Sequence, residues 1–201
     1  GKEDSKIIVC HLGNGASISA VQNGKVVDTS MGMTPLAGIM MGTRTGDADP
    51  ASVIYIMRKR GLSLDEMNTR MNKQSGILGI FGESSDFRDL DTARREGKER
   101  AVLAYEMFCY RVQLYIGAYV AAMNGIDAIA FTGGIGENSV GVKQHICESL
   151  SYFGIELDEE KNAQRLPGNV ELSTKDSKVK IYKIETAEEL VIARDTYRLT
   201  K

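Results

Sequence analysis

The chain has 201 residues, 42% hydrophobic and 26% charged, a composition typical of a globular protein with one large or two small domains. Its net charge of −2 offers no basic surface for nucleic acid or an anionic membrane, and no apolar run approaches the ~20 residues of a spanning helix. The three cysteines are widely spaced among apolar residues, which favours reduced thiols and a cytoplasmic protein over a disulfide framework.

The opening of the chain predicts three strands joined by tight turns. Residues 6–12 form the first strand, and Gly13-Asn14-Gly15 turns it back into a second, residues 16–21, which alternates in polarity. Asn23-Gly24 is the pair that a type I′ hairpin turn favours, and residues 25–30 return as the third strand.

A long loop and two capped helices are predicted next. Residues 31–49 have no clear period and read as a loop, and loops of this length inside compact domains are usually functional. Asp49-Pro50 starts a helix that Gly61 ends, and Ser63 with Glu66 forms the capping box of a second helix. The glycine-rich residues 76–82 are predicted as a loop or short strand.

The second half predicts helices alternating with strands. Residues 98–124 form a helix that is apolar on most faces and should cross the core. Residues 128–131 form an apolar strand, residues 140–153 a helix, and residues 179–184 the last strand. Thr186 and Glu189 read as a capping box for a terminal helix. This order predicts an α/β domain with a mixed sheet and helices on its faces.

The central strand runs into a glycine-dense turn, residues 132–138. Its glycines permit a sharp turn without side chains in the way of a ligand, and the following helix presents free N–H groups to a phosphate. An ordinary strand-to-helix connection is the alternative. A P-loop is absent, the third glycine of a Rossmann fingerprint is missing, and no nucleophile elbow occurs. Two histidines without close cysteine pairs argue against a zinc site.

Three other positions have both a functional and a plain structural interpretation. Gly13-Asn14-Gly15 can form an anion-binding nest or a simple hairpin turn. Arg44 can neutralise a transferring phosphoryl group or pair with Asp47 or Asp49 at the surface. Glu188 can hold magnesium or only complement the helix dipole.

Four motifs, in residues 11–17, 41–47, 131–138 and 188–194, together resemble the acetate kinase family. The resemblance is to the carboxy-terminal half of the family and covers the chain from about residue 6 onward. It implies a ribonuclease-H-like domain of the actin-like ATPase superfamily, and an amino-terminal domain that is absent from residues 1–201. It also implies reversible, Mg²⁺-dependent transfer of the γ-phosphoryl group of ATP to acetate, giving acetyl phosphate and ADP.

The resemblance implies roles for individual residues. The nucleotide would lie against three segments, namely His11, Leu12, Gly13, Asn14 and Gly15; Asp86, Phe87 and Arg88; and Gly134, Ile135, Gly136, Glu137 and Asn138. Asn14 would lie near the transferring group, and Arg44 would bind acetate and stabilise the phosphoryl transition state. Pro35 would form a wall of the acetate pocket, and Glu188 would help to hold Mg²⁺.

The chain departs from the family in two ways. Glu185 and Ala187 stand where Pro and Asn are usual, which should change little. More seriously, the absent half supplies further catalytic residues, so the chain alone is expected to carry half a site and to be inactive. The alternatives are a propionate kinase or, for the fragment, a non-catalytic nucleotide-binding or dimerisation domain. The resemblance also implies a homodimer.

Overall fold

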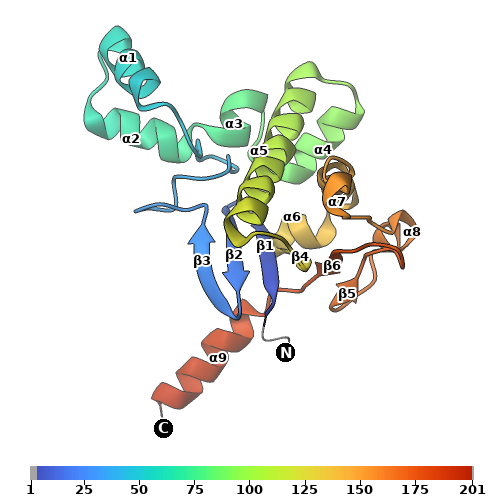
Figure 1. Cartoon of the computed structure of the whole chain (residues 1–201). Coiled ribbons are helices and arrows are strands. Elements are labelled where there is room, and N and C mark those ends of the chain that lie inside the picture. Colours follow the sequence, from blue (N-terminus) through green and yellow to red (C-terminus); the bar gives the residue numbers. More distant parts are fainter. Residues whose placement is uncertain (1–3, 201) are drawn as a thin grey trace.

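The computed structural model describes residues 4–200, except for the side chain of residue 188, and its strands form one six-stranded sheet (Figure 1). The strands are β1 (Lys6–Leu12), β2 (Ala16–Gln22), β3 (Lys25–Thr29), β4 (Ala128–Thr132), β5 (Val170–Glu171) and β6 (Lys180–Lys183). Their order across the sheet is β3-β2-β1-β4-β6-β5. Because β1 pairs antiparallel with β2 but parallel with β4, the sheet is mixed, as the sequence predicted.

The predicted three-stranded meander is confirmed. Asn23 and Gly24 have φ values of 55° and 75°, the positive values that a type I′ turn requires at both central positions. Along β1 the side chains of Ile8, Cys10 and Leu12 are buried on one face, because successive strand residues point to opposite faces.

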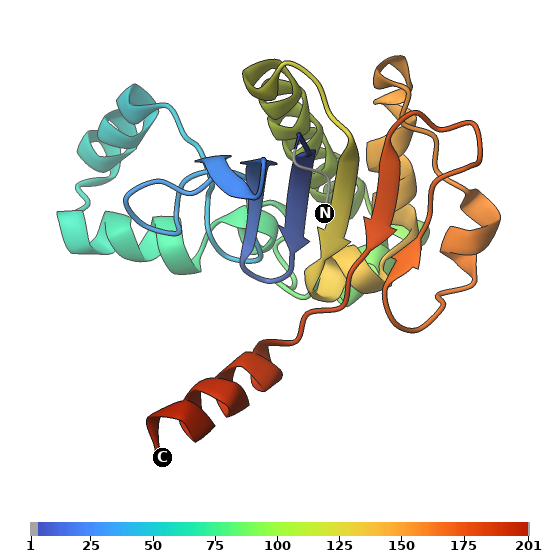
Figure 2. The ribbon, with the colours of Figure 1, turned by 60° about the horizontal axis from the view of Figure 1, so that its bottom comes forward.

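The helices cover one face of this sheet and extend beyond both of its edges. They are α1 (Pro50–Arg60), α2 (Leu64–Lys73), α3 (Gly76–Phe81), α4 (Phe87–Arg95), α5 (Glu99–Met123), α6 (Gly133–Asn138), α7 (Val140–Glu148), α8 (Glu159–Ala163) and α9 (Glu188–Leu199). In Figure 2, α5 and α7 lie behind the sheet, and no described helix crosses the face toward the viewer, whereas helices were expected on both faces. The expected mixed α/β fold is confirmed.

The long helix α5 supplies much of the core. Phe108, Val112 and Ile116 are fully buried, and the helix packs against β1, β2, α4 and α7. The predicted burial of α5 is confirmed on the side that packs against the sheet, but the helix lies on one face of the sheet and does not cross the core. Its outer side leaves Leu103 and Tyr110 more than half exposed.

The predicted starts of α1 and α2 are confirmed. Asp49 accepts a hydrogen bond from the backbone N–H of Ala51, and Pro50 occupies the first helical position. Ser63 and Glu66 form the reciprocal capping box. No residue of α1 is buried.

Three predicted elements differ in the structure. Residues 76–81 form the helix α3 rather than a loop or strand, because the N–H groups of Ile77 and Leu78 are held by the carbonyls of Met41 and Gly42. The helix predicted over 140–153 ends at Glu148 and is followed by a 3-10 turn, Ser151–Phe153. The capping box predicted at Thr186 does not form, and α9 has Ala187 at its N-cap without a side-chain hydrogen bond.

The terminal helix α9 projects away from the rest of the molecule (Figures 1 and 2). Its apolar residues Val191 and Ile192 are therefore more than half exposed. None of the described helices has both the length and the apolar content needed to cross a membrane.

Candidate nucleotide-binding site

A cavity of about 1140 Å³ opens at the carboxyl ends of the parallel strands β1 and β4. Such an edge, where two strands end side by side, is where open α/β sheets usually bind ligands. Three segments that are distant in sequence form most of its lining: the turn after β1, residues 85–96 along α4, and the stretch from α6 into α7. Its lining residues are Gly13, Asn14, Gly42, Ile77, Ser85, Asp86, Phe87, Arg88, Asp91, Thr92, Arg95, Glu96, Gly134, Ile135, Asn138, Ser139, Val140 and Arg165.

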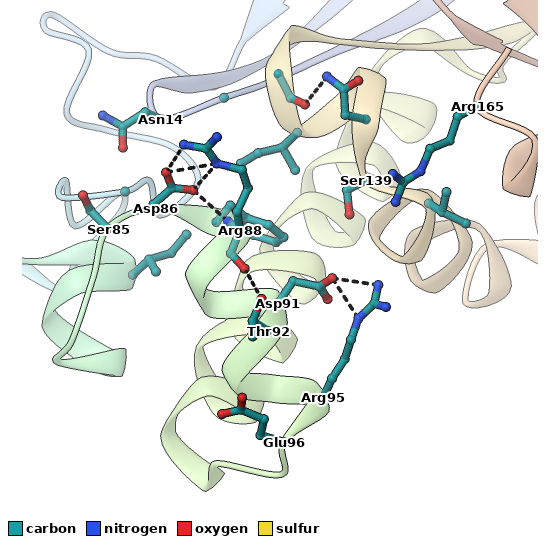
Figure 3. A pocket seen from close by; sticks show the side chains of 18 residues that line it. Asn14, Ser85, Asp86, Arg88, Asp91, Thr92, Arg95, Glu96, Ser139 and Arg165 are labelled. Carbon is teal, nitrogen blue, oxygen red and sulfur yellow. Dashed lines mark hydrogen bonds and ion pairs between the residues drawn. The ribbon is translucent and has the colours of Figure 1, made fainter.

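The turn after β1 presents Asn14 to the cavity (Figure 3). Its backbone carbonyl accepts a hydrogen bond of 3.1 Å from Gly42 N–H, which ties the turn to the long loop. A Cβ atom at Gly42 would lie 1.8 Å from Asn14 Oδ1, so glycine at position 42 is what allows Asn14 this conformation. Of the predicted residues before it, Leu12 is fully buried and His11 is half-buried, and neither lines the cavity.

The glycine-dense turn lies directly beside this first turn. Gly133 has φ of 77°, and a Cβ there would come within 2.8 Å of Leu12 O, so only glycine fits comfortably at this approach. Gly134 instead faces open space, with no atom within 4 Å of the position of its missing Cβ. Gly136 is buried against β1 and does not line the cavity. The turn thus brings bare backbone to the cavity at Gly134.

The polar ends of the predicted residues Glu137 and Asn138 bond within the protein. Asn138 Nδ2 donates to Gly134 O at 2.9 Å. Glu137 Oε1 accepts from the backbone N–H of Gly133 at 3.1 Å and from that of Thr186 at 3.0 Å. These two side chains therefore fix the shape of the turn and its distance from the start of α9.

The third predicted segment, Asp86 to Arg88, forms the start of α4 and the opposite wall of the cavity. Asp86 caps the helix by accepting from Arg88 N–H, and its carboxylate also pairs with the Arg88 guanidinium at 2.6 Å (Figure 3). The side-chain hydrogen bond from Arg88 lowers the pKa of Asp86 to about 2. Phe87 points into the core, where its ring packs 5.2 Å from that of Phe108. Asp86 and Arg88 are therefore the polar side chains that this predicted segment contributes to the wall.

Arg44 lies beside the first turn but lines a second, smaller cavity. Its Nη1 atom lies 3.5 Å from the position that a Cβ of Gly15 would occupy, and it donates to Pro35 O at 3.2 Å. The second cavity, of about 550 Å³, is lined by Thr34, Leu36, Thr43, Arg44, Asn68, Asn72 and Lys73. Pro35 contacts Arg44 through its carbonyl and is not among those lining residues.

The alternative of a surface ion pair for Arg44 is not supported, since no described carboxylate lies within ion-pair distance of it. Asp49 instead caps α1, and Asp47 binds α5. The Asp47 carboxylate accepts from Gly38 N–H at 2.8 Å, from Arg111 at 2.6 Å and from the Tyr115 hydroxyl at 2.5 Å. Asp47 thereby fastens the long loop, and Arg44 with it, to the long helix.

The predicted magnesium ligand, Glu188, has a side chain outside the described part of the structure. Its backbone begins α9, two residues after Thr186, which Glu137 holds against the glycine turn. The described residues contain no group of three or more His, Cys, Asp or Glu side chains arranged to hold a metal.

Several lining residues were not predicted from the sequence. Asp91, Thr92 and Arg95 follow Arg88 at intervals of three, four and seven residues, the spacing of one helix face, so the helical period could have placed them in the wall. Arg165 follows α8 and has a positive φ of 50°. No local sequence pattern connects it with the cavity.

Comparison with known proteins identifies the family. Residues 1–194 match the model of the acetokinase family. The chain belongs to the acetokinase family. It is 63% identical over 199 residues to acetate kinase of Fusobacterium nucleatum and 56% identical over 199 residues to acetate kinase of Heliobacterium modesticaldum. Each comparison covers 99% of this chain but 50% of the relative, so the chain spans about half the length of these curated relatives.

Solved structures of the acetokinase type have the same fold. The Porphyromonas gingivalis acetate kinase superposes with a TM-score of 0.93 at 43% identity, covering 99% of this chain and 50% of that one. A propionate kinase from Francisella tularensis superposes with a TM-score of 0.88 at 42% identity, covering 96% of this chain and 49% of that one. The family resemblance inferred from the four motifs is thereby confirmed.

Proposed function

We propose that this chain is the nucleotide-binding half of an acetate kinase, which reversibly transfers the γ-phosphoryl group of magnesium-bound ATP to acetate. The observation that carries the proposal is the convergence of Asn14, Asp86–Arg88 and Gly134 on one cavity, with Arg44 adjacent to the same turn. A cavity of about 1140 Å³ has ample room for a nucleotide. The names of the relatives support acetate as the acceptor.

In this proposal the reaction needs positioning and charge neutralisation more than proton transfer. Acetate is already ionised at neutral pH, so one of its oxygens attacks the γ-phosphorus without a general base. A new P–O bond forms to acetate while the bond to the β,γ-bridging oxygen breaks, and that electron pair leaves with ADP. Arg44 would offset charge on the equatorial oxygens, Asn14 would orient the transferring group, and Glu188 would hold the nucleotide's magnesium through water.

The adenosine would lie between the α4 wall and the glycine turn. Asp86 and Arg88 would border the adenine, while the backbone of Gly134 and the amide of Asn138 would face the sugar and phosphates. The turn His11–Gly15 would hold the phosphates mainly through the backbone of Gly13, which is half-buried, and of Gly15, which is exposed, because the Leu12 side chain is buried. Pro35 would help to form the acetate pocket next to Arg44.

The complete enzyme would require a second half that complements this one. The relatives are about twice as long, and the exposed apolar face of α9 at Val191 and Ile192 would be covered by such a half. Without it the chain is expected to bind nucleotide but not to catalyse transfer.

We also propose a homodimer. Its support is the exposed stripe Leu103, Met107, Tyr110 and Leu114 on α5, which repeats at intervals of four, three and four residues.

The experiment that tests this proposal has two stages. Titration calorimetry of ADP–Mg²⁺ against this chain should detect binding, since the proposed nucleotide contacts lie within it. The chain is then joined to the amino-terminal half of the Fusobacterium nucleatum relative, and acyl phosphate formation is assayed with acetate and with propionate. Faster turnover on propionate would favour the second candidate, a propionate kinase, which the Francisella tularensis structure supports. Absence of both binding and turnover would refute the nucleotide site.

We also propose that the protein is cytoplasmic, and the three buried, free cysteines support this setting.

A further inference from the structure

A buried lysine lies behind the glycine turn. Lys143, on α7, is 2% exposed, and its Nζ atom donates three hydrogen bonds to backbone carbonyls. The acceptors are the oxygens of Gly136 at 3.1 Å, Glu137 at 3.2 Å and Ser139 at 3.0 Å. An ammonium group has three N–H donors, so every donor is used.

The ammonium group is held by carbonyl dipoles rather than by an ion pair. No described carboxylate lies within ion-pair distance of Lys143 Nζ. Removing an ammonium from water is unfavourable, and a methionine of similar length would fill the same space without that cost. The charged group therefore contributes to the structure through the backbone carbonyls that it holds.

That backbone is the end of α6 and its junction with α7. Helix α6 has only six residues and begins with two glycines, so its own propensity for helix is weak. Its last carbonyls have no partner within the helix, as at the end of any helix. Lys143 satisfies two of them, and a third at Ser139, so one side chain clamps the turn between the two helices.

The clamped segment forms one wall of the nucleotide cavity. Gly134, Asn138 and Ser139 line it, while Lys143 itself does not. Figure 3 shows the Ser139 side chain at this wall. We propose that Lys143 is a positioning residue, which fixes α6 from behind so that the Gly134 backbone and the Asn138 amide keep the geometry that nucleotide binding requires. This inference rests on the proposed nucleotide site.

The hydrogen bonds that Lys143 donates to the three carbonyls depend on pH. Burial, and then the positive charges of Lys183 on β6 and of Arg165, lower the pKa of Lys143 to about 8, whereas Cys147 on α7 and Glu137 on α6 oppose this change. At neutral pH the ammonium form prevails and makes all three bonds. Loss of its proton leaves two N–H donors for three carbonyls.

The test compares Lys143→Met with Ile146→Ala in the whole chain. Ile146, also fully buried on α7, has no polar atom that could hold α6, so its replacement removes buried packing from the same helix without touching those hydrogen bonds. ADP–Mg²⁺ affinity is measured by calorimetry at pH 7 and pH 9, and backbone hydrogen exchange of residues 134–142 is measured without nucleotide.

We expect Lys143→Met to weaken ADP binding about tenfold and to speed exchange across residues 134–142, with Ile146→Ala within about twofold of the unmodified chain. Affinity of the unmodified chain should fall between pH 7 and pH 9, and that of Lys143→Met should not. If the unmodified chain binds ADP and Lys143→Met binds it equally well, the inference is wrong while the proposed function stands. If the unmodified chain does not bind ADP, the proposed function is refuted, and unchanged exchange in Lys143→Met would overturn the clamp as well.

Discussion

Glu137 Oε1 accepts a hydrogen bond of 2.9 Å from the hydroxyl of Thr186, which lies 49 positions further along the chain. The same oxygen accepts the backbone N–H groups of Thr186 and Gly133. One carboxylate therefore joins the start of the glycine turn to the segment that leads into α9. The cavity wall is thus connected to Thr186, two residues before Glu188, the residue proposed to hold magnesium.

Replacing Glu137 by Ala should release that connection. All three bonds are lost, so the N–H groups of Gly133 and Thr186 should exchange faster, and the start of α9 should no longer be fixed. In the protein completed with an amino-terminal half, we expect turnover to fall at least about tenfold through misplacement of Glu188. The matched control is Thr186→Val, which removes only the hydroxyl donor and should have a smaller effect. Equal turnover in Glu137→Ala and the unmodified protein would show that the connection has no functional role.

Arg44→Ala tests the proposed phosphoryl contact. Loss of a cation that neutralises the transition state commonly lowers turnover by about two to three orders of magnitude. Because Arg44 lines the second cavity and not the larger one, ADP affinity should change by less than about threefold. Arg44→Lys keeps the charge without the planar fork and should recover only part of the rate. A large loss of ADP binding in Arg44→Ala would place the guanidinium in the nucleotide site instead.

Gly134→Ala tests whether the nucleotide approaches bare backbone. Open space surrounds the missing Cβ, and alanine favours helix over glycine by about 1 kcal/mol, so the folded chain should be no less stable. A methyl group there points to the cavity and should weaken ADP binding. Gly117→Ala, inside α5 and equally free of neighbours, provides the control, with a similar gain in stability and unchanged ADP affinity. Unchanged affinity in Gly134→Ala would exclude close contact at this position.

Asp47→Ala should loosen the loop that carries Arg44. Its carboxylate accepts from Gly38, Arg111 and Tyr115, and at a partly exposed site the loss of such bonds costs about 1–2 kcal/mol. We expect faster hydrogen exchange within residues 31–49 and reduced turnover of the completed protein, with ADP affinity preserved. Tyr115→Phe removes one of the three donors and should produce an intermediate result. Loss of ADP affinity in step with turnover would instead indicate general unfolding.

Local sequence signals predicted those parts of the fold that local bonds determine. The Asn23-Gly24 hairpin and the Ser63–Glu66 capping box depend on residues within four positions of each other, and both are present. The capping box at Thr186 was wrongly predicted: Ala187 holds the N-cap position, and the backbone N–H and hydroxyl of Thr186 donate to Glu137, a partner that no local pattern contains. Only the fold brings them together.

The candidate site also has parts that local sequence signals predict and parts that depend on the fold. The glycine turn after β4 and the turn after β1 could be predicted as binding elements, because glycines at the end of a strand indicate a sharp turn with exposed backbone. Arg165 and Lys143 could not be predicted as part of the site, since the role of a single cation on a loop or a helix depends on neighbours that only the fold reveals. The roles of the individual residues came from the family resemblance, and they remain predictions for these variants to test.

The pH dependence of stability provides a final test of Lys143. Its pKa is lowered from 10.5 to about 8 in the folded chain, mainly by burial, so between these values the unfolded chain binds more protons than the folded one. Stability contributed at this site must therefore rise with pH across that window, by up to about 3 kcal/mol. Burial raises the pKa of the Cys147 thiol to about 12 and acts in the opposite direction, so the total for the chain does not isolate the lysine. The difference in unfolding free energy between the unmodified chain and Lys143→Met removes the contributions that both proteins share, and leaves that of the lysine with its coupling to Cys147. Measured by urea unfolding from pH 7.5 to pH 10, this difference should shift steadily in favour of the unmodified chain, and a constant difference would show that Lys143 keeps an ordinary pKa.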